Sequence, residues 1–274
     1  WGDYQSDFPR QKASLASFYL QDQWRPWSRL SLTSGVRLDH HQSFGPAATF
    51  RLAANLDWPE QQARFKLTLG SGFKAPSLYE LYAPPDNLGP IGNSSLEPEK
   101  NLGWDVGMEK SFFNRLTLSL TYFETRFRHL IQFYYGTGYQ NLGQAQTRGL
   151  ELSLKAVPIK NLDLSASWTH LQARDLDHQT DLLRRPKNTF YANLNFSRKA
   201  VRISSEVYYL GQRYDLDYSS YPNQEVCLQS ALLVNLLVSY DLKSTMSFFI
   251  RGDNLFDTRY EMVYGYGSPG ATIS

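Results

Sequence analysis

The sequence predicts an all-β fold, a transmembrane antiparallel β-barrel, for the whole of residues 1–274. Apolar and polar residues alternate with period two over segments of about nine to twelve residues, longer than the five or six of an average strand. Short and long connections between these segments follow one another in turn. Aromatic residues make up 15% of the chain, yet no apolar run approaches the roughly 18 residues that a spanning helix needs.

The alternating stripes run through most of the chain. Between Leu116 and Tyr122, leucine or tyrosine takes every second position, and threonine or serine takes the positions between. Similar stripes occur in segments 30–39, 162–169, 201–209 and 232–240. Their polar sides carry short hydroxyls, charges and amides, as a water-filled lumen requires. A soluble β-sandwich also alternates, so strand length and loop order are what favour the barrel over that alternative.

The connections indicate which strand ends face which side of a membrane, because outer-membrane barrels have short periplasmic turns and long extracellular loops. We predict short turns at 25–28, 59–61, 113–114, 158–161, 197–199 and 241–244. We predict long loops at about 40–46, 73–101, 127–145, 173–186, 212–228 and 255–270. Trp24, Trp27 and Trp58 flank short turns and would belong to the periplasmic aromatic girdle.

This pattern gives about twelve strands, plus the start of another after Pro269. That last strand stops at Ser274, before it could cross a bilayer. A half barrel would expose two unpaired strand edges in lipid, which is costly. We therefore expect the chain to be a fragment, and its start at Trp1 does not resemble a signal peptide.

The composition excludes several classes of function. A formal net charge of +2 gives no basic face for nucleic acid. The single cysteine, Cys227, excludes a disulfide within the chain, and it leaves open a partner outside the fragment or an unpaired loop thiol. The sequence has no serine elbow, metal-ligand helix or suggestive carboxylate pair, so we predict no catalytic residue and no enzyme.

Three groups of His and Asp residues raise the question of a metal. His40 and His41 are adjacent in a strand, so their side chains point to opposite faces and cannot both hold one ion. Loop carboxylates could hold a hard cation, but a solvated acidic loop is the preferred interpretation. These carboxylates are Asp175, Asp177 and Asp181 beside His178, and the pair Asp215 and Asp217. We predict no metal site and no cofactor in this chain.

Several motifs are arranged in a long, ordered pattern. Residues 72–82 read GFKAPSLYELY and are followed by GNSSLEPEK at 92–100. Residues 141–143 read NLG, before TRGLE at 147–151, and residues 253–261 read DNLFDTRYE. Over nearly the whole chain, these motifs resemble the TonB-dependent outer-membrane receptors. A finer resemblance, to the vitamin B12 receptors of that family, lies in Val263–Gly270, although Ala271 stands where those receptors carry a basic residue.

The resemblance implies a bacterial outer-membrane barrel of about 22 strands, of which this chain would hold about 12 to 13. A plug domain, the early strands and the end of the last strand would be missing. The family takes up a scarce ligand actively, bound by external loops and the plug, with energy from the inner-membrane TonB complex. The implied partners are membrane lipid, the protein's own plug, the TonB complex and a small molecule, and we expect a monomer. Calcium, as the B12 receptors imply, would bind in an earlier part of the chain.

Cobalamin is the first substrate prediction, on the strength of Val263–Gly270. A ferric siderophore is the alternative, with haem or a glycan also open, and a passive porin is the alternative of another class. The candidate ligand contacts are loop residues, which could instead pack the loops onto the rim: Tyr79, Tyr82, Asn93, Tyr134, Tyr135, Tyr218, Tyr221, Tyr264 and Tyr266. The candidate lumen residues, preferred as contacts to the plug rather than to the ligand, are Arg37, Arg51, Lys66, Glu151, Glu206 and Arg251.

Overall fold

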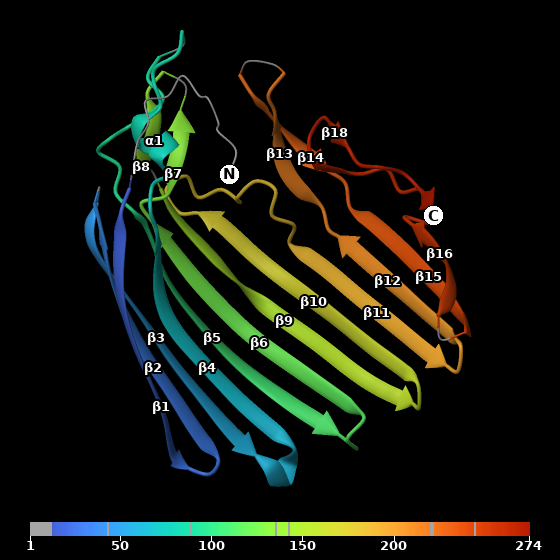
Figure 1. Ribbon diagram of the computed structural model, residues 1–274. Coiled ribbons are helices and arrows are strands. Elements are labelled where there is room, and N and C mark those ends of the chain that lie inside the picture. Colours follow the sequence, from blue (N-terminus) through green and yellow to red (C-terminus); the bar gives the residue numbers. More distant parts are fainter. Residues whose placement is uncertain are drawn as a thin grey trace.

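The alternating segments form the wall of a single curved sheet (Figure 1). The computed structural model describes residues 13–42, 44–87, 89–134, 136–141, 143–219, 222–243 and 245–274. Its main sheet has 13 strands in the order β1-β2-β3-β4-β5-β6-β9-β10-β11-β12-β15-β16-β19. Each strand pairs antiparallel with its neighbours, and β1 and β19 form the two edges. The predicted all-β class and the predicted strand count are confirmed.

The wall strands are long, as the alternation predicted. They are β1 (Leu15–Trp27), β2 (Leu30–His41), β3 (Gly45–Trp58), β4 (Ala63–Lys74), β5 (Glu99–Phe112), β6 (Leu116–Arg128), β9 (Gln144–Ile159), β10 (Leu162–Asp175), β11 (Asn188–Arg198), β12 (Val201–Leu210), β15 (Ala231–Lys243), β16 (Met246–Asp253) and β19 (Thr272–Ile273). A transmembrane strand needs about nine to eleven residues, so most of these strands can cross a bilayer.

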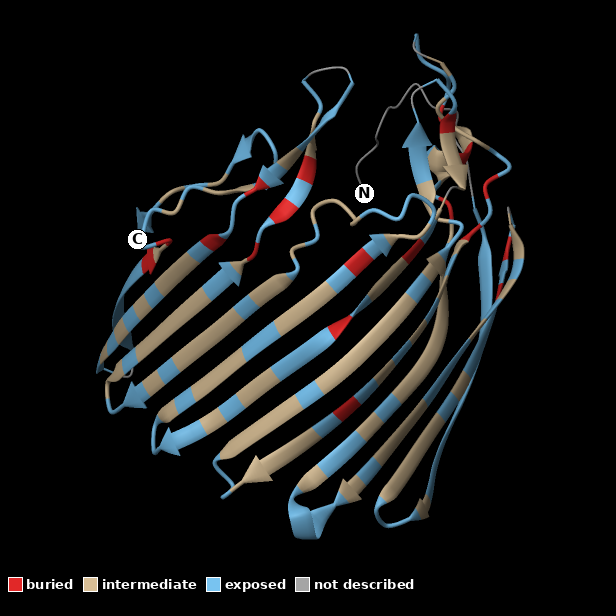
Figure 2. Ribbon diagram, turned by 180° about the vertical axis from the view of Figure 1, so that it is seen from behind, coloured by how far each residue is buried: buried red, intermediate tan, exposed pale blue. Residues whose placement is uncertain are grey.

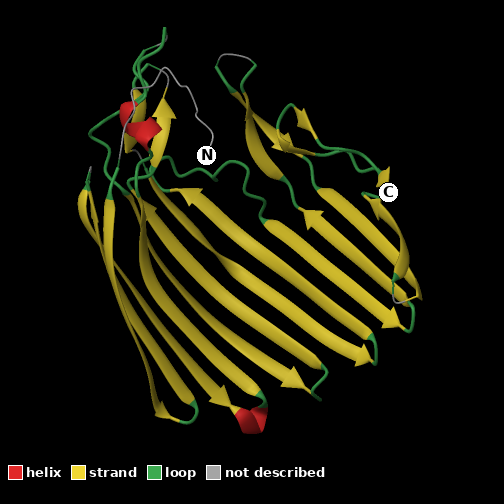
Figure 3. Cartoon of the chain, in the orientation of Figure 1, coloured by secondary structure: helices red, strands yellow, loops and turns green. Residues whose placement is uncertain are grey.

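The predicted turns lie at one end of the wall and the loops at the other. At the turn end, Phe113 and Asn114 both have positive φ, 52° and 54°, and are the central residues of the turn between β5 and β6 in which Arg115 N–H donates to the Phe112 carbonyl at 3.0 Å. The exposed Trp24, Trp27 and Trp58 lie near the same end. The 3-10 helix η1 (Pro59–Gln61) closes another turn there, while the helix α1 (Leu78–Tyr82) lies at the loop end (Figure 3).

The loops differ from the prediction in two ways. The connection expected as a long loop over 40–46 is short, because β2 continues to His41 and β3 begins at Gly45. Three of the other loops contain hairpins that were not predicted. These are β7 (Ile131–Tyr134) with β8 (Gly138–Asn141), β13 (Arg213–Asp217) with β14 (Gln224–Leu228), and β17 (Glu261–Val263) with β18 (Tyr266–Gly267). Pairing within each hairpin provides hydrogen-bond partners for backbone N–H and C=O groups that lie beyond the strands of the wall.

Strand register places the apolar stripes on one face. Val106 on β5 is the register partner of Tyr122 on β6, which pairs in turn with Leu150 on β9. Leu102 and Val106 have 48% and 46% of their surface exposed, so none of the described residues covers this stripe. A soluble sandwich would cover it with a second sheet, but the other sheets of the described residues are two-stranded hairpins. The soluble alternative is therefore wrong, and the stripe suits contact with lipid.

Among the described residues, no helix has the length and apolar character needed to cross a membrane. Buried residues are few in the wall and gather mainly at the loop end of the strands (Figure 2). They include Leu81, Leu96, Arg213, Asp215 and Leu228. The best-packed part of the described chain is therefore its loop end, which is where a ligand from outside would arrive.

Candidate ligand-binding loops

Two loop groups stand on opposite sides of the loop end of the sheet (Figure 1). The first loop group consists of α1 with the segment that follows it and the hairpin β7–β8. The second loop group consists of the hairpin β13–β14, the β10–β11 connection and the segment that carries β17–β18. Different interactions hold the two groups together.

The first loop group is held by amides and backbone hydrogen bonds. Ser77 and Glu80 form a capping box at the start of α1, with Ser77 Oγ accepting from Glu80 N–H at 3.2 Å. Asn93 Nδ2 donates to the carbonyl of Tyr139 at 2.9 Å, which joins the segment after α1 to β8. Asn141 accepts from Glu97 N–H at 2.6 Å and donates to the Glu97 carbonyl at 2.9 Å. The GNSSLEPE motif therefore holds this loop group together, and we call these contacts of Asn93 and Glu97 with β8 the clasp.

An aromatic cluster forms the exposed side of the first loop group. The rings of Tyr79 and Tyr139 meet edge to face at 6.3 Å, and Phe133 meets Tyr139 at 5.2 Å. Tyr79 nevertheless keeps 54% of its surface exposed. Burial, with the negative charge of Glu80 next, raises the pKa of Tyr139, so this phenol stays protonated at neutral pH. The cluster offers neutral aromatic surface and hydroxyl groups to an incoming molecule.

The second loop group is anchored to the wall by Asn254. Asn254 begins the turn that follows β16, in the NLFD sequence. Its φ is 50°, a left-handed backbone conformation that asparagine tolerates. The Asn254 side chain donates to the carbonyl of Thr258 at 3.0 Å and accepts from Thr258 N–H at 3.0 Å. Farther along, Asp257 accepts from the N–H of Ala271 at 2.9 Å. The motif thus fixes both ends of the loop that carries β17–β18.

A buried carboxylate joins three segments of the second loop group. Asp215 on β13 is fully buried and accepts from Arg184 Nε at 2.7 Å, from Leu216 N–H at 2.8 Å and from Tyr264 N–H at 2.9 Å. Arg213, also buried, donates from Nη2 to the carbonyl of Glu261. We call Arg184, Arg213 and Asp215 the loop lock, because together they join β13, the β10–β11 connection and β17.

Burial and hydrogen bonding act on the loop lock in opposite directions. Burial alone would raise the pKa of Asp215, but hydrogen bonds from Tyr264 N–H, Leu216 N–H and Arg184 outweigh it and lower the pKa. Burial lowers the pKa of Arg213, while the nearby charge of Asp215 opposes that shift. Arg213 Nε is buried without a hydrogen-bond partner in the described structure. The loop lock therefore depends on the charge of Asp215.

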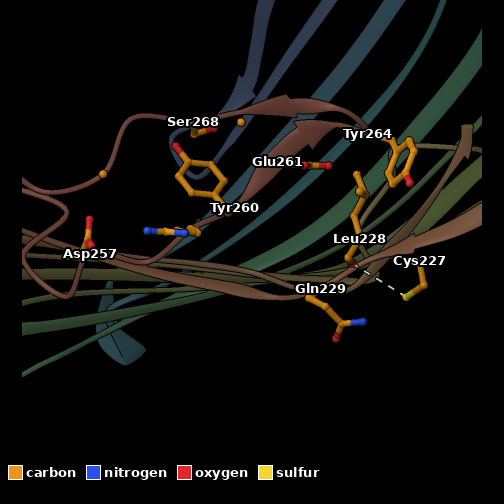
Figure 4. A pocket seen from close by; sticks show the side chains of 11 residues that line it. Cys227, Leu228, Gln229, Asp257, Tyr260, Glu261, Tyr264 and Ser268 are labelled. Carbon is orange, nitrogen blue, oxygen red and sulfur yellow. Dashed lines mark hydrogen bonds between the residues drawn. The ribbon is translucent and has the colours of Figure 1, made fainter. Parts of the chain in front are cut away.

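A cavity of about 590 Å³ lies within the second loop group (Figure 4). Cys227 and Gln229 line it from the end of β14, and Asp257, Tyr260 and Tyr264 line it from the segment opposite. Its lining combines aromatic rings, carboxylates, an amide and Arg259, which suits a ligand with both polar and apolar parts. No three His, Cys, Asp or Glu side chains gather as a metal set within the part of the chain described here.

The predicted ligand residues are divided between the two groups. Tyr79, Tyr82, Asn93 and Tyr134 belong to the first group, and Tyr218, Tyr264 and Tyr266 to the second. Tyr264 lines the cavity, and Tyr218 and Tyr266 are largely exposed. Asn93 and Tyr134 already make internal hydrogen bonds, Tyr134 to Gln132 at 2.9 Å. Tyr135 and Tyr221 lie outside the described residues. The assignment of all nine to ligand contact stays a prediction.

The six predicted lumen residues share one face of the wall by strand register: Arg37, Arg51, Lys66, Glu151, Glu206 and Arg251. Arg37 pairs with buried Asp39 at 2.8 Å, and Lys66 pairs with Glu109 at 3.0 Å. Arg251 pairs with Asp253 at 2.9 Å, and Glu206 accepts from Asn235 at 3.4 Å. Arg51 and Glu151 are exposed. Contact with a plug remains a prediction for all six.

The sequence interpretation of Asp215 is also wrong. Asp215 was assigned to a solvated acidic loop, but it is fully buried and ion-paired. Sequence reasoning also missed Arg184, Arg213, Phe133 and Tyr139. The partners of Asp215 lie 31 and 49 residues away along the chain, so no local pattern could have identified them. A buried charge at the start of a loop hairpin becomes visible only when the loops are placed together.

The lipid-suited stripe, the polar opposite face and the long packed loops at one end define an outer-membrane β-barrel. The chain belongs to the family described as "TonB dependent receptor-like, beta-barrel", whose pattern matches residues 1–255. Like the other members of that family, it is a protein of the bacterial outer membrane. The predicted family and localisation are confirmed.

Solved structures show the same fold at low sequence identity. A mutant of the ferric enterobactin receptor (PfeA) from Pseudomonas aeruginosa has a TM-score of 0.79 and 21% identity, covering 95% of this chain and 44% of that one. The siderophore receptor PirA from Acinetobacter baumannii has a TM-score of 0.81 and 16% identity, covering 97% and 46%. The ferric-catecholate import receptor Fiu from Escherichia coli has a TM-score of 0.78 and 14% identity, covering 95% and 44%. The chain thus spans less than half the length of these receptors.

Proposed function

We propose that the protein takes up a ferric siderophore across the outer membrane in a TonB-dependent manner. The observation that carries this proposal is the family match over residues 1–255, because members of this family are receptors and transporters. The similar structures named above are receptors for ferric enterobactin, ferric catecholates or siderophores. Their names support the siderophore alternative better than the cobalamin reading that the sequence placed first.

The segment behind the cobalamin prediction has a local structural role. Gly265 has a φ of 82° in the turn between β17 and β18, where a side chain would be strained. The N–H of Tyr264, next to it, donates to Asp215. The turn thus explains the glycine of the Tyr-Gly-Tyr sequence without reference to any ligand, and the contact with the loop lock uses only the backbone of Tyr264. We therefore place cobalamin second.

Both loop groups can take part in binding a ferric siderophore. A catecholate complex has flat aromatic rings around a hydrophilic iron centre. The Tyr79 cluster offers rings for stacking or edge contact, and the cavity beside Tyr264 offers polar groups together with rings. We propose that a plug domain lies against the charged lumen face and couples uptake to the TonB complex. A passive porin would lack that coupling.

The test is ligand binding by the full-length receptor in detergent. Ferric siderophores of the catecholate, hydroxamate and mixed classes would be titrated beside cyanocobalamin, with and without calcium. Tight binding of one siderophore and none of cyanocobalamin is the expected result. Tight binding of cyanocobalamin alone would restore the first sequence prediction. Binding of neither, together with steady ion conductance in a planar bilayer, would favour a porin and contradict the proposal.

A further inference from the structure

The outward face of the wall changes character abruptly on three neighbouring strands. On β6, the outward residues Leu116, Leu118, Leu120 and Tyr122 give way to Glu124, Arg126 and Arg128. On β9, Leu154, Leu152 and Leu150 give way to Arg148, Gln146 and Gln144 toward the loop end. Register shows that this is one boundary, because Tyr122 pairs with Leu150 and Glu124 pairs with Arg148. On β10, Gln172 and Arg174 continue it.

Five cations occupy this region. We call Lys100, Arg126, Arg128, Arg148 and Arg174 the outward basic face. Among the described residues, two acids contact these cations: Glu124 accepts from Arg126 Nε at 3.0 Å and from Gln146 Nε2 at 2.8 Å, and Asp181 Oδ1 lies 3.9 Å from Arg174 Nε. The register partners of Arg128 are Lys100 and Gln144, so two cations stand directly opposite each other. Like charges in that position destabilise a sheet, unless an anion lies between them.

The height of the outward basic face is set by aromatic rings just below it. Trp104 and Tyr122 pack at 5.2 Å between ring centroids, and Trp168 lies on β10. Such rings mark the boundary between hydrocarbon and headgroups. Arg126 is four residues beyond Tyr122, about 13 Å along the strand, or about 9 Å in height at a tilt of about 45°. The guanidinium groups therefore lie at the level of the lipid headgroups.

The feature is local to this part of the wall. On β12 and β15, the outward stripe carries no charged residue up to the loop end, where Tyr209 and Leu232 are register partners. If the loop ends of these strands simply extended into water, polar residues of either charge would serve there. An excess of positive charge would not be needed. The side chains are also accessible, with 64% of Arg126 and 56% of Arg174 exposed. Charge complementarity and continuity with the lipid-facing stripe point to the same occupant.

We propose that the outward basic face binds phosphate groups of outer-leaflet glycolipid headgroups. Arginine suits this role because its planar fork of donors matches phosphate oxygens in a bidentate manner. A basic residue near an anionic membrane surface contributes about 1 kcal/mol each, so several together select phosphate-bearing lipid. The proposal concerns the outer side of the wall and does not depend on the uptake ligand.

The experiment compares two triple variants of the full-length receptor. Arg126→Gln/Arg128→Gln/Arg148→Gln removes three charges from the outward basic face. The matched control, Lys160→Gln/Arg198→Gln/Lys199→Gln, removes three exposed charges at the turn end of the strands. Heat-modifiable gel mobility establishes that each variant is folded. Binding of diphosphorylated lipid A and of lipid A without phosphates is then measured in detergent at low and high salt.

The expected result is that the first variant binds diphosphorylated lipid A about 10-fold or more weakly than the wild type, with a smaller effect of salt. The control variant should bind it as the wild type does, and dephosphorylated lipid A should bind weakly to all three. Equal binding of diphosphorylated lipid A to both variants would overturn the proposal. Equal binding of the two lipids by the wild type would overturn it as well, because phosphate would not be recognised.

Discussion

The two loop groups solve the same problem, holding long loops above a barrel wall, by different chemistry. In the first group, side-chain amides join the segment after α1 to β8: the Asn93 amide donates to Tyr139, and the Asn141 amide donates to Glu97. Carboxylates add to them, because Glu97 Oε2 lies 2.9 Å from His129 Nδ1 and Glu99 accepts from Ile131 N–H at 2.9 Å. In the second group, the buried Asp215 carboxylate and two arginines join the segments. The amide contacts of the first group carry no net charge and so respond little to pH or salt. In the second group, loss of one charged member leaves a buried charge without its partner, which is costly.

This difference suggests a division of labour. The first group leaves aromatic surface exposed, with Tyr79 over half exposed. The second group surrounds a cavity whose walls come from segments that the loop lock holds together. An open aromatic surface suits first contact with a ligand, and a cavity lined from two segments suits tighter retention. Four predictions test this contrast, beginning with the largest expected effect.

Asp215→Asn should release the second loop group. The substitution keeps the size of the side chain but removes the charge that Arg184 and the buried Arg213 face. Because Arg184 is partly exposed, we expect a local loss of about 2 to 3 kcal/mol rather than the full cost of breaking a deeply buried pair. Hydrogen exchange should become faster in β13, β14 and β17 and stay unchanged in β7 and β8.

Asp217→Asn is the matched control for that prediction. Asp217 lies in the same hairpin, but its carboxylate accepts from Ser219 N–H and Ser219 Oγ at 2.8 and 2.6 Å, within its own turn. Its exchange profile should resemble that of the wild type. If Asp215→Asn left the exchange of β17 unchanged, the loop lock would not hold the group together.

Tyr79→Ala should weaken siderophore binding about three- to tenfold, the contribution of one aromatic contact. Tyr79 is exposed on α1 and meets the ring of Tyr139 edge to face, and the capping box of Ser77 and Glu80, which starts the helix, is left intact. Phe113→Asn is the control, since Phe113 is exposed at the turn end and has a positive φ that asparagine tolerates. An unchanged dissociation constant for Tyr79→Ala would exclude the first group from binding.

Cys227 is a native reporter for the second group. It is a free, exposed cysteine and lines the cavity. Bound siderophore should slow its reaction with a maleimide severalfold, measured on the Cys227 peptide by mass spectrometry. The same ligand at the same concentration should not slow labelling of the Tyr79→Ala variant to that extent. Labelling that is independent of the ligand would place binding outside the cavity.

The wall was predictable from the sequence because each strand is encoded locally. Alternation from Leu116 to Tyr122 determines which face of β6 meets lipid, and register then places Leu150 and Trp168 on the same face. Short turns such as Phe113–Asn114 are also local. The strands of the wall and their number were therefore predicted from the two-residue period of apolar residues and from the spacing of the turns.

The loops were predictable only in part. The ELY and GNSSLEPE motifs marked the first group, but their role as a clasp depends on Tyr139 and Asn141, more than 40 residues away. Asp215 carried no local sign of burial, because a second aspartate, Asp217, stands two residues away, as in an ordinary acidic loop. The hairpins β7–β8 and β13–β14 lack the long alternation that revealed the wall. Tertiary contacts between loops, rather than local propensity, determine this end of the molecule.

The exposed pair Asp175 and His178 should show the smallest effect, and it sharpens the contrast with buried Asp215. His178 Nδ1 lies 2.9 Å from Asp175 Oδ2, and this contact with Asp175 raises the pKa of His178. Burial works against it, but hydrogen bonds from His178 and Asp177 lower the pKa of Asp175. The raised pKa of His178 stabilises the folded turn at pH values below the ordinary histidine pKa of about 6.5. This stabilisation is lost as the pH rises through the pKa that His178 has in the folded protein. The lowered pKa of Asp175 stabilises the folded turn at pH values above the ordinary aspartate pKa of about 3.9. This stabilisation is lost as the pH falls through the pKa that Asp175 has in the folded protein.

The turn at 175–178 should therefore be most protected from hydrogen exchange between those two ordinary values, after correction for intrinsic rates. His178→Asn should flatten the upper limb of that profile and leave β13–β14 unaffected. The loop lock behaves differently, because Asp215 titrates only at low pH and Arg213 keeps its proton throughout this range. If β13–β14 lost protection together with the 175–178 turn as pH rose past neutrality, the two charge pairs would be coupled, and the second loop group would respond to pH as one unit.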